Sequence, residues 1–406
     1  MNATAIFRRM AEAGASVINH QSNAFPTGEQ DQFQRRWTIN GDFLRFRPNG
    51  VARHARETVL ALDRLVEEQH PLTQSLSLQL VSPCEPDQDF RLNAISQKVV
   101  PEYSRPRLPQ FWVQAQLPFH VEGGLLSFCN LAPVAVARQI VCIHDVHTYI
   151  MPESYGRGFR WTHRLVLPIL GRRTRRVVTV SRYSRESIVD YGVARMDKLS
   201  VVYNGCDHVR RWNAEASRLR FGNRPFVLCL GQPQAYKNLP LVLSLLPELQ
   251  ELGFDLALAG DIGENYIREH LGEVPKNLVL LGRVSDDDLA KAYRQAFCFL
   301  FPSRIEGFGL PALEAMMHGC PVIASRAAAI PEICENAVVY GGVDSPAEWI
   351  AALRMLIQQP KTRTRLSEDA RRQASRYTWR GVAERYLHLM AAVDAADYRL
   401  LDRKAC

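Results

Sequence analysis

The sequence lacks the features that mark secreted, membrane-spanning and disulfide-built proteins. Its nine cysteines are an odd number without a C-x-x-C pair, and most lie inside apolar runs, as reduced, core-packed cysteines do. It contains no apolar run of about 18 residues, and its first residues lack the apolar core of a signal peptide. We therefore expect a cytoplasmic protein in which any contact with the inner face of the cytoplasmic membrane is peripheral.

Strongly basic charge is also absent from most of the chain, although the net charge is +8. Residues 151–200 contain 11 Lys and Arg against 4 Asp and Glu, whereas residues 1–150 contain 14 of each kind. Nucleic-acid binding requires basic residues along one face and a recognition motif, and the sequence has no zinc-finger, helix-turn-helix or RNA-recognition pattern. The charge therefore predicts a local docking surface and no nucleic-acid partner.

With 406 residues, 47% of them hydrophobic and 23% charged, the chain is expected to fold into two globular domains. Short apolar runs alternate with helical patterns such as 51–65, and this alternation is typical of parallel α/β domains. The predicted fold class is therefore α/β, with two doubly wound Rossmann-like domains. The expected strands are 42–46, 76–81, 124–126, 140–143, 177–180, 199–202, 226–230, 256–259, 278–281, 297–301, 322–324 and 338–340.

Changes of pattern along the chain predict its organisation. A polar stretch at about 205–222 marks the link between the domains. Ser285 precedes three aspartates and is expected to begin a helix, and Ser345 and Glu348 have the spacing of a capping box with proline at the first helical position. The predicted segments are an N-terminal arm (1–37), a first domain (38–206), a second domain (207–378) and a final amphipathic helix (379–406).

The loop that follows the expected strand end at Phe301 is the most informative segment. Ligands of open parallel sheets bind at the loops after the carboxyl ends of the strands. This loop contains glycines and leads to Pro311 at a helix start, whose free N–H groups suit an anion such as a diphosphate. Glu306 and Glu314 can both face the same crevice. The alternative is that Glu314 only complements the helix dipole and that Glu306 is a solvated loop residue.

The pattern E-G-F-G-L-P-A-L-E-A-M-x-x-G-x-P-V-I, which begins at Glu306, resembles the signature of the retaining glycosyltransferases of family 4. The resemblance implies the GT-B fold, in which two Rossmann-like domains face each other across a cleft and a C-terminal helix crosses back to the first domain. It also implies that Glu314 binds the ribose of a nucleotide sugar and that Glu306 contacts the donor sugar. The same segment is expected to bind the donor through Gly307, Phe308, Gly309 and Leu310.

Other loops agree with the resemblance. The loop after the strand 226–230 retains Lys237, which the family places on the donor diphosphate, but Gln232 and Tyr236 stand where many members have arginine. Lys237 is therefore expected to carry more of the phosphate charge, together with helix N-termini. The alternative is a solvated lysine in an ordinary turn. The donor-binding residues implied outside the signature are Gly50, Gly231, Gln232, Lys237, Asn238, Gly260, Arg283 and Val284.

His144 follows an apolar strand and resembles the histidine that the family places near the donor sugar. The resemblance makes it a candidate catalytic residue with Glu306 and Lys237, and leaves open whether it acts as a base or orients the sugar; the alternative is a structural histidine. Residues 181–184 and 204–207 resemble the V-S-x-x-S and N-G-x-D segments that flank the cleft.

Asp87 and Asp89 match the D-x-D string with which other glycosyltransferases hold a divalent cation. They lie in a loop that contains prolines, and a pattern of only three residues is expected to occur by chance in many sequences. We therefore expect neither a metal nor another cofactor. An NAD-dependent enzyme is disfavoured, because no G-x-G-x-x-G pattern follows any expected strand.

The reaction that the resemblance implies is transfer of a sugar, with retained configuration, from a nucleotide sugar to a hydroxyl of a glycan or a polyprenyl-diphosphate-linked acceptor. This is the chemistry of bacterial surface polysaccharide biosynthesis. GDP-mannose is the first candidate donor, and dTDP-rhamnose and UDP-glucose are the alternatives. A non-enzymatic alternative is a nucleotide-sugar-binding or membrane scaffold protein with an inactive site.

Residues 156–176 contain most of the local charge and mix arginines with Phe159, Trp161 and leucines. Such a segment is suited to the anionic surface of the inner membrane leaflet. The alternative is a solvated arginine face with Trp161 packed in the core, and Pro168 disfavours a continuous helix.

Overall fold

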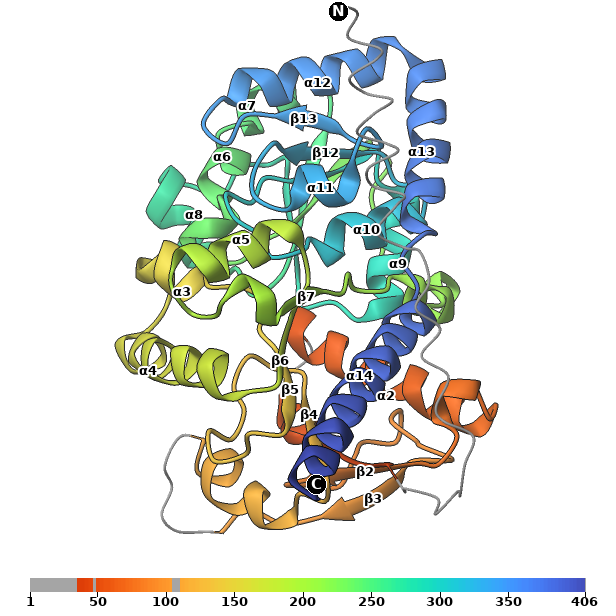
Figure 1. Ribbon diagram of the computed structural model, residues 1–406. Helices are drawn as coiled ribbons and strands as arrows, with labels where there is room; N and C mark the ends of the chain where they lie inside the picture. The colour runs from red at the N-terminus through yellow and green to blue at the C-terminus, as the bar shows by residue number, and fades with distance from the viewer. Residues whose placement is uncertain (1–34, 47–48, 104–109, 406) are drawn as a thin grey trace, which may run out of the picture. The chain divides into compact units, whose positions relative to one another are not determined.

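The described part of the chain contains two parallel β-sheets. The computed structural model describes residues 35–46, 49–103 and 110–405, with side chains up to residue 399. One sheet has seven strands in the order β3-β2-β1-β4-β5-β6-β7, and the other has six in the order β10-β9-β8-β11-β12-β13 (Figure 1). All neighbouring strands within these residues are parallel. The predicted α/β class with two Rossmann-like sheets is therefore confirmed.

The strands define a first domain, which contains β1–β7, and a second domain, which contains β8–β13. The first sheet consists of β1 (Arg35–Asn40), β2 (Leu76–Ser82), β3 (Ser96–Val99), β4 (Gly124–Ser127), β5 (Gln139–Cys142), β6 (Arg176–Thr179) and β7 (Leu199–Val201). The second consists of β8 (Phe226–Leu230), β9 (Asp255–Ala259), β10 (Leu278–Gly282), β11 (Cys298–Phe301), β12 (Val322–Ser325) and β13 (Val339–Gly341).

Helices connect the strands. The α-helices are α2 (Gly50–Glu67), α3 (His147–Ile150), α4 (Arg157–Arg173), α5 (Arg182–Asp190), α6 (Leu239–Leu243), α7 (Leu246–Glu251), α8 (Glu264–Leu271), α9 (Asp286–Gln295), α10 (Leu310–Met317), α11 (Ile330–Cys334), α12 (Pro346–Gln358), α13 (Pro360–Ala374) and α14 (Trp379–Ala405). Short helical turns are η1 (Asp42–Arg45), η2 (Pro71–Thr73), η3 (Trp112–Gln116), η4 (Leu117–His120), η5 (Pro152–Ser154), η6 (Met196–Lys198), η7 (Asp207–Arg211), η8 (Ala214–Ala216) and η9 (Ala235–Lys237).

Local sequence explains most of these elements. Every residue of β4, β5, β11 and β12 is buried, which is why these strands are continuous apolar runs rather than alternating patterns. The Asn49 side chain accepts the N–H of Ala52 at 2.9 Å and begins α2. Ser285 and Asp288 form a complete capping box at the start of α9, so the helix start predicted there is confirmed.

The first strand lies earlier than the sequence pattern predicted. Residues 42–46, expected as a strand, contain the turn η1. The Asn40 side chain accepts the N–H of Asp42 at 3.1 Å, and Arg45 pairs with the Asp42 carboxylate. These side-chain contacts favour a turn directly after β1 and override the alternation of apolar residues.

The predicted N-terminal arm, residues 1–37, overlaps β1. Its last three residues belong to the strand, where Trp37 is buried and its indole N–H donates to Asp394 of α14 at 2.9 Å. Residues 1–34 lie outside the described residues. The first sheet therefore begins at residue 35, and the predicted boundary between 37 and 38 falls inside a strand.

Two further local features differ from the prediction. Strand β3 was not expected, because it lies at the edge of its sheet and its exposed polar side chains leave no apolar pattern. Ser345 stands at the N-cap of α12, but its side chain makes no capping hydrogen bond. The Glu348 carboxylate accepts the N–H of Gly342 at 2.9 Å instead, so the predicted capping box is wrong.

The final helix crosses back to the first domain, as the resemblance implied. α14 packs along α2 (Figure 1). Tyr386 is buried with its ring centroid 5.0 Å from that of Phe128. Further along the helix, Asp394 accepts hydrogen bonds from Arg35 and Arg138, each at 2.6 Å. The helix is therefore fixed to the first sheet by both apolar and ionic contacts.

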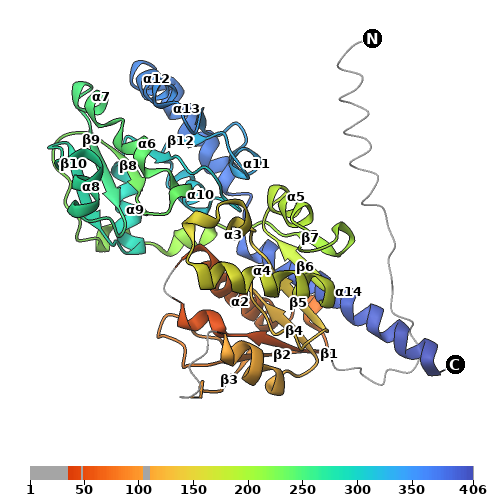
Figure 2. The ribbon, with the colours of Figure 1, turned by 90° about the vertical axis from the view of Figure 1, so that its left-hand side faces the viewer.

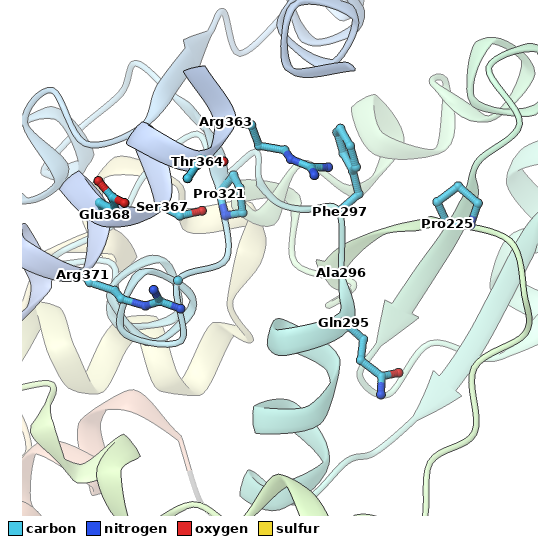
Figure 3. Close-up of a pocket in the computed structure, with 11 residues that line it drawn as sticks. Pro225, Gln295, Ala296, Phe297, Pro321, Arg363, Thr364, Ser367, Glu368 and Arg371 are labelled. Atoms are coloured by element: carbon cyan, nitrogen blue, oxygen red, sulfur yellow. The ribbon is translucent and has the colours of Figure 1, made fainter. Parts of the chain in front are cut away.

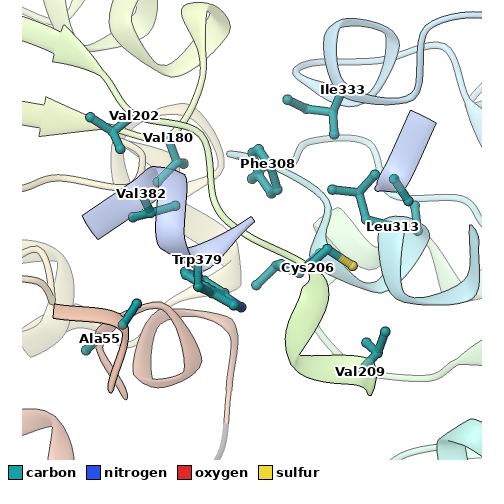
Figure 4. Packing of buried hydrophobic residues seen from close by; sticks show 14 of the residues in the cluster. Ala55, Val180, Val202, Cys206, Val209, Phe308, Leu313, Ile333, Trp379 and Val382 are labelled. Atoms are coloured by element: carbon teal, nitrogen blue, oxygen red, sulfur yellow. The ribbon is translucent and has the colours of Figure 1, made fainter. Parts of the chain in front are cut away.

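The link between the sheets passes against the start of α14. A Cβ added to Gly205 would lie 2.4 Å from the backbone nitrogen of Trp379, so only glycine permits this approach. The Trp379 indole donates to His208 Nδ1 at 3.0 Å. Figure 4 shows the apolar cluster at this crossing, which includes Phe308 of the second domain and Val202 of the first.

Gly205→Ala is expected to destabilise the protein by about 1–3 kcal/mol, because the added methyl group overpacks the contact with Trp379. Gly222→Ala is the matched control, since a Cβ there meets no atom within 4 Å. Urea unfolding followed by tryptophan fluorescence measures the difference. Equal midpoints for the two variants would show that the crossing does not require glycine.

Candidate active site

A buried ion pair joins two of the three predicted catalytic residues. Lys237 ends η9, the turn after β8, and Glu306 lies in the loop after β11. Lys237 Nζ donates to Glu306 Oε1 at 2.8 Å, and the side chains are only 16% and 12% exposed. Burial lowers the pKa of Lys237, but the Glu306 carboxylate and the Tyr236 hydroxyl together outweigh this effect and hold that pKa above its ordinary value. The lysine is therefore charged at neutral pH.

The third predicted catalytic residue, His144, follows β5 and lies against the same loop. A Cβ added to Gly307 would lie 3.1 Å from the His144 carbonyl oxygen. Ser184 of α5 donates to the Gly307 carbonyl at 3.3 Å. The loops after β5, β6 and β11 therefore meet, so that the carboxyl edges of the two sheets contact each other where an α/β site is expected.

The His144 imidazole is buried and held in one orientation. Its Nε2 lies 2.8 Å from the Phe128 carbonyl, which can only accept, so Nε2 carries the proton and Nδ1 keeps the lone pair. The backbone N–H of His144 donates to Asn130 at 2.7 Å. Burial lowers the pKa of His144, although the bond to Phe128 opposes this effect. The residue therefore offers a neutral ring.

His54 of α2 lies against His144, with the ring centroids 4.8 Å apart. Its Nδ1 lies 2.7 Å from Asn204 Oδ1, and its Nε2 lies 3.3 Å from the Tyr386 hydroxyl. His, Cys, Asp and Glu side chains can bind metal ions. Within the described ranges, one group of three has its possible ligand atoms within 4.8 Å of one another: His54, Cys142 and His144. Burial lowers the pKa of His54 and raises the pKa of Cys142 to about 12. Both nitrogens of His54 have protein partners, so the cluster is accounted for as a hydrogen-bonded core.

Glu314, the predicted ribose-binding residue on α10, is buried and held from outside its own domain. Its Oε1 lies 3.1 Å from His208 Nε2, on the link, and 3.7 Å from Arg53 Nε, on α2. Arg53 also donates to both carboxylate oxygens of Asp286, at 2.9 and 2.7 Å. Ribose hydroxyls would therefore meet a carboxylate of which one oxygen already accepts a hydrogen bond from His208 and lies beside the Arg53 guanidinium.

Gly50 and Leu310, both predicted near the diphosphate, lie side by side. A Cβ added to Gly50 would meet only the Leu310 side chain, at 3.9 Å. Gly50 begins α2 and Leu310 begins α10, after Gly309 with a φ of 104°. Two helix starts are thus neighbours, and helix starts favour anions.

The glycines that were predicted to bind the donor, in the loops after β8 and β9, are also required by the backbone geometry of these loops. A Cβ on Gly260 would lie 2.0 Å from the Gly231 carbonyl oxygen, and the φ of Gly260 is 138°. Asn238, at φ 56°, donates its side-chain amide to the carbonyls of Pro302 and Val343 at 3.2 and 2.8 Å. These residues shape the loop that carries Lys237, whichever ligand it binds.

The remaining predicted donor residues differ in their surroundings. Arg283 makes an exposed ion pair with Asp261 at 2.5 Å. Gln232 is exposed and Val284 is half-buried. The Phe308 side chain is buried in the core, so only its backbone is free to contact a ligand.

The two flanking segments have clear structural roles. Ser181 caps α5 by accepting the N–H of Ser184 at 2.9 Å. Asn204 fixes His54, and the Asp207 carboxylate accepts the N–H of Trp379 at 2.8 Å. The V-S-x-x-S and N-G-x-D patterns therefore position the site's surroundings.

Sequence reasoning missed several residues that complete the site. Arg53 and His208 hold Glu314, and Glu332 of α11 accepts the N–H groups of Arg182 and Tyr183 at 2.8 and 3.1 Å. Arg53 is the last residue of segment 50–53, which resembles the family's G-V-x-R pattern, so a signal for it is present in the sequence, although no contact with Glu314 was predicted from it. The others lie more than 100 residues from their partners, and no local pattern marks them.

Helix α4 is continuous through Pro168, contrary to the prediction, and packs on β5 and β6 (Figure 2). Its outward face carries Trp161, 72% exposed, and Leu165, 67% exposed, among arginines. The alternative of a core-packed Trp161 is therefore wrong. In the part of the chain that the structure describes, no helix has the length and apolar character that crossing a bilayer requires.

Asp87 of the D-x-D pattern forms a bidentate ion pair with Arg56, in which the guanidinium donates to the two carboxylate oxygens at 2.9 and 2.7 Å. These hydrogen bonds lower the pKa of Asp87. The pair belongs to the start of the first domain and lies far along the chain from Lys237 and Glu306. The carboxylate thus has a protein partner of its own.

A surface hollow of about 470 Å³ lies before β11 and β12, at the opposite edge of the second sheet from the candidate site (Figure 3). The Arg363 guanidinium covers the ring of Phe297 at 4.4 Å, and Arg371 donates to the His318 carbonyl at 3.4 Å. The hollow contains none of the predicted site residues.

Two family models match consecutive parts of the chain. Residues 48–210 match the model of glycosyltransferase family 4, and residues 210–373 match the model of glycosyl transferases group 1. The chain belongs to glycosyltransferase family 4. The point at which one model gives way to the other lies in the link between the two sheets of this family 4 protein.

Curated relatives of this family 4 protein carry several specificities. The chain is 26% identical over 316 residues to the sulfoquinovosyl transferase SQD2 of Arabidopsis thaliana, and covers 59% of that protein with 73% of its own length. It is 26% identical to O-antigen chain mannosyltransferase B of Escherichia coli, over 61% of this chain and 68% of that one. The chain therefore spans about three fifths to two thirds of the length of these relatives.

Solved structures share the fold. Sucrose-phosphate synthase from Thermosynechococcus elongatus superposes with a TM-score of 0.66 at 16% identity, over 89% of this chain and all of that one. HepE from Anabaena, in complex with UDP and glucose, gives 0.64 at 16% identity over 88% of this chain and 99% of that one. The family 4 chain therefore has the GT-B fold.

His318, at the end of α10, provides a pH-dependent test of this region. Its ring stacks between Trp212 and Tyr293, with centroids 5.7 and 5.9 Å away, and its Nε2 is buried without a partner. Burial, aided by Arg294, lowers the pKa of His318 from 6.5 to about 4. Between these values the unfolded chain binds a proton that the folded chain does not, so stability falls as the pH falls through this window.

We expect His318→Phe, which keeps the stacked ring, to unfold at a urea concentration that depends less on pH than that of the parent protein between about pH 7 and about pH 4.5. Urea titrations at several pH values measure the two slopes. Parallel slopes for the parent and the variant would contradict the assignment.

Proposed function

We propose that this protein is a retaining glycosyltransferase that moves a hexose from a nucleotide sugar to a hydroxyl of a glycan or polyprenyl-diphosphate-linked acceptor. The observation that supports this most directly is the Lys237–Glu306 ion pair, which lies where the loops of both sheets meet. Family membership supports the class of reaction.

The ion pair suggests how the donor is received. The donor diphosphate competes with the Glu306 carboxylate for Lys237, and the hydroxyls of the donor sugar replace the lysine as partners of Glu306. After the exchange Lys237 is paired with the diphosphate and Glu306 accepts hydrogen bonds from hydroxyls, so neither buried charge is left without a partner, which lowers the cost of breaking the existing contact. The neighbouring starts of α2 and α10 add positive potential beside the phosphates.

The transition state of this transfer carries positive charge on the sugar ring and negative charge on the leaving diphosphate. Lys237 and the two helix starts are fixed positive groups that stabilise the diphosphate. We propose front-face attack, in which the leaving phosphate oxygen accepts the proton of the acceptor hydroxyl. His144 then acts as a neutral ring that orients the sugar, because its Nε2 proton is engaged by Phe128.

We propose that transfer needs no divalent cation, since these groups supply positive charge at the diphosphate. For the donor, GDP-mannose is the first candidate because two of the curated relatives are O-antigen chain mannosyltransferases. UDP-glucose and dTDP-rhamnose remain alternative donors, and surface polysaccharide biosynthesis is the proposed setting. A thermal-shift screen with these three sugars and UDP-N-acetylglucosamine identifies the donor.

Glu306→Gln and Lys237→Ala are each expected to lower kcat by roughly 100-fold, because each removes a charge that acts on the reacting groups. Release of the nucleoside diphosphate, measured in EDTA with the donor found in the screen, reports turnover, and circular dichroism confirms folding. Lys276→Ala, an exposed lysine of the same domain, is the matched control. A folded Glu306→Gln with full activity would contradict the proposal, and activity lost in EDTA but restored by manganese would contradict metal independence.

We also propose that α4 docks on an anionic membrane surface. The exposed Trp161 and Leu165 share one helix face with Arg157, Arg164 and Arg172, since they recur at spacings of three, four and seven residues. Apolar side chains ringed by arginines suit an interface at which anionic lipid headgroups meet acyl chains. Such docking would bring the transferase to a lipid-linked acceptor.

Arg164→Ala is expected to lower the partition coefficient onto vesicles about fivefold, the effect of one basic residue at an anionic surface. Flotation with vesicles of phosphatidylglycerol and phosphatidylcholine, at low and high salt, measures partitioning. Arg365→Ala, an exposed arginine of α13, is the control. Absence of binding to anionic vesicles at low salt would rule out the docking surface.

A nucleotide-sugar-binding scaffold without activity is the alternative from another class. The retained Lys237, Glu306 and Glu314 and the membership of a glycosyltransferase family favour an enzyme. Donor hydrolysis by the purified protein separates the two functions.

A further inference from the structure

Three buried polar atoms without hydrogen-bond partners belong to segments that meet beside the candidate site. They are Nε2 of His147, Oγ of Ser154 and the side-chain oxygen of Gln234. Buried polar atoms are normally paired, so each unpaired atom requires an explanation. None of the three residues was predicted as part of the donor site.

The three residues come from both domains. His147 begins α3 and Ser154 ends η5 in the first domain, whereas Gln234 precedes η9 in the second. The turns η5 and η9 contact each other. The His147 ring also lies against Tyr236 of η9, with centroids 5.6 Å apart. The three unpaired atoms therefore belong to segments that meet at one junction, and Gln234 precedes Lys237 by three residues.

A stack of aromatic rings holds this junction together. Tyr155 lies parallel to Tyr236 at 6.2 Å and to Phe159 of α4 at 5.6 Å. Lys237 Nζ lies 5.1 Å from the centroid of the Tyr236 ring. Tyr155 therefore packs against rings from both domains, and the stack forms a wall of the junction.

The orientation of His147 is fixed by Asp145. The Asp145 carboxylate accepts the backbone N–H of His147 at 3.0 Å and lies 3.7 Å from Nδ1. This contact turns Nδ1 toward the carboxylate, so Nε2 is the atom left without a partner in a side chain that is only 5% exposed.

Charge decides which ligand suits the junction. The charged side chains that act on the Tyr155–Tyr236 stack are Asp145, Glu306 and Lys237. Lys237 and Glu306 neutralise each other, so Asp145 leaves the junction with a negative charge that disfavours an anionic ligand there. The donor diphosphate is proposed to bind Lys237 itself, after it displaces Glu306. Neutral hydroxyl groups, which both donate and accept, match an imidazole nitrogen, a hydroxyl and an amide oxygen.

We infer that His147, Ser154 and Gln234 form a subsite for the neutral sugar hydroxyls of the acceptor. The inference rests on the proposed function, because the subsite lies beside the groups assigned to the donor. Its polar atoms are left unpaired in the free protein and gain their partners when the acceptor binds. It also explains why a tyrosine, which stacks, occupies position 236 beside the lysine.

Equilibrium binding of methyl α-D-mannopyranoside and methyl α-D-glucopyranoside, followed by saturation-transfer NMR, tests the subsite without turnover. His147→Phe and Gln234→Met are expected to weaken binding of the better ligand at least tenfold. Binding of GDP or UDP, measured by calorimetry, should stay within twofold. Gln358→Met, an exposed glutamine of α12, is the matched control. Tighter binding of mannose 6-phosphate than of the neutral sugars would overturn the assignment.

Thermal stability separates a ligand-binding role from a structural one. Replacing an unpaired buried polar atom with an apolar group removes an unsatisfied group, so the unfolding midpoints of His147→Phe and Gln234→Met should be unchanged or raised. A structural residue would lose stability instead. Lowered midpoints, or sugar binding equal to that of the parent protein, would overturn the inference.

The two hypotheses fail in different ways. If the parent protein binds no nucleoside diphosphate, the proposed function fails, and the sugar-binding comparison still decides the subsite. If it binds a nucleoside diphosphate but neither neutral sugar, the subsite is refuted and the proposed function stands.

Discussion

A buried carboxylate that must be paired connects the two described domains. Glu314 accepts from His208 and lies beside Arg53, and an unpaired charge at this depth would be far more costly than either contact. His208 belongs to the link and is itself held by Trp379 at the start of α14. One side chain of the second domain therefore fixes the link, the crossing helix and, through Arg53, the first helix of the first domain.

This arrangement has consequences for the chemistry. With α2 and α10 held together, Gly50 and Leu310 become neighbours and two helix starts act on the same region. The Lys237–Glu306 pair then meets the loop of His144 across Gly307. In the described structure Lys237 and Glu306 neutralise each other, so the groups proposed to receive the donor are already assembled beside His144.

Sequence reasoning predicted proximity correctly where it depends on position along a strand. Lys237, Glu306 and His144 each follow a strand end, and parallel strands place such loops at one edge, so the prediction that they lie near one another required no knowledge of packing. It failed where a few side chains override a pattern. Contacts of Asn40 and Arg45 favour the turn η1 where a strand was expected. The Glu348 carboxylate accepts a hydrogen bond from Gly342 and does not take part in a capping box at the start of α12.

The sequence by itself determined the two α/β domains, the family and the residues of the loop after β11, because these depend on local periodicity and on a contiguous signature. Only the tertiary structure decided which charges are paired, which polar atoms are left without partners and where Trp161 lies. These properties arise from residues such as Arg53 and Asp286, or His147 and Tyr236, that are distant along the chain. Their energies depend on burial and separation in space, which no pattern of neighbours in the sequence encodes.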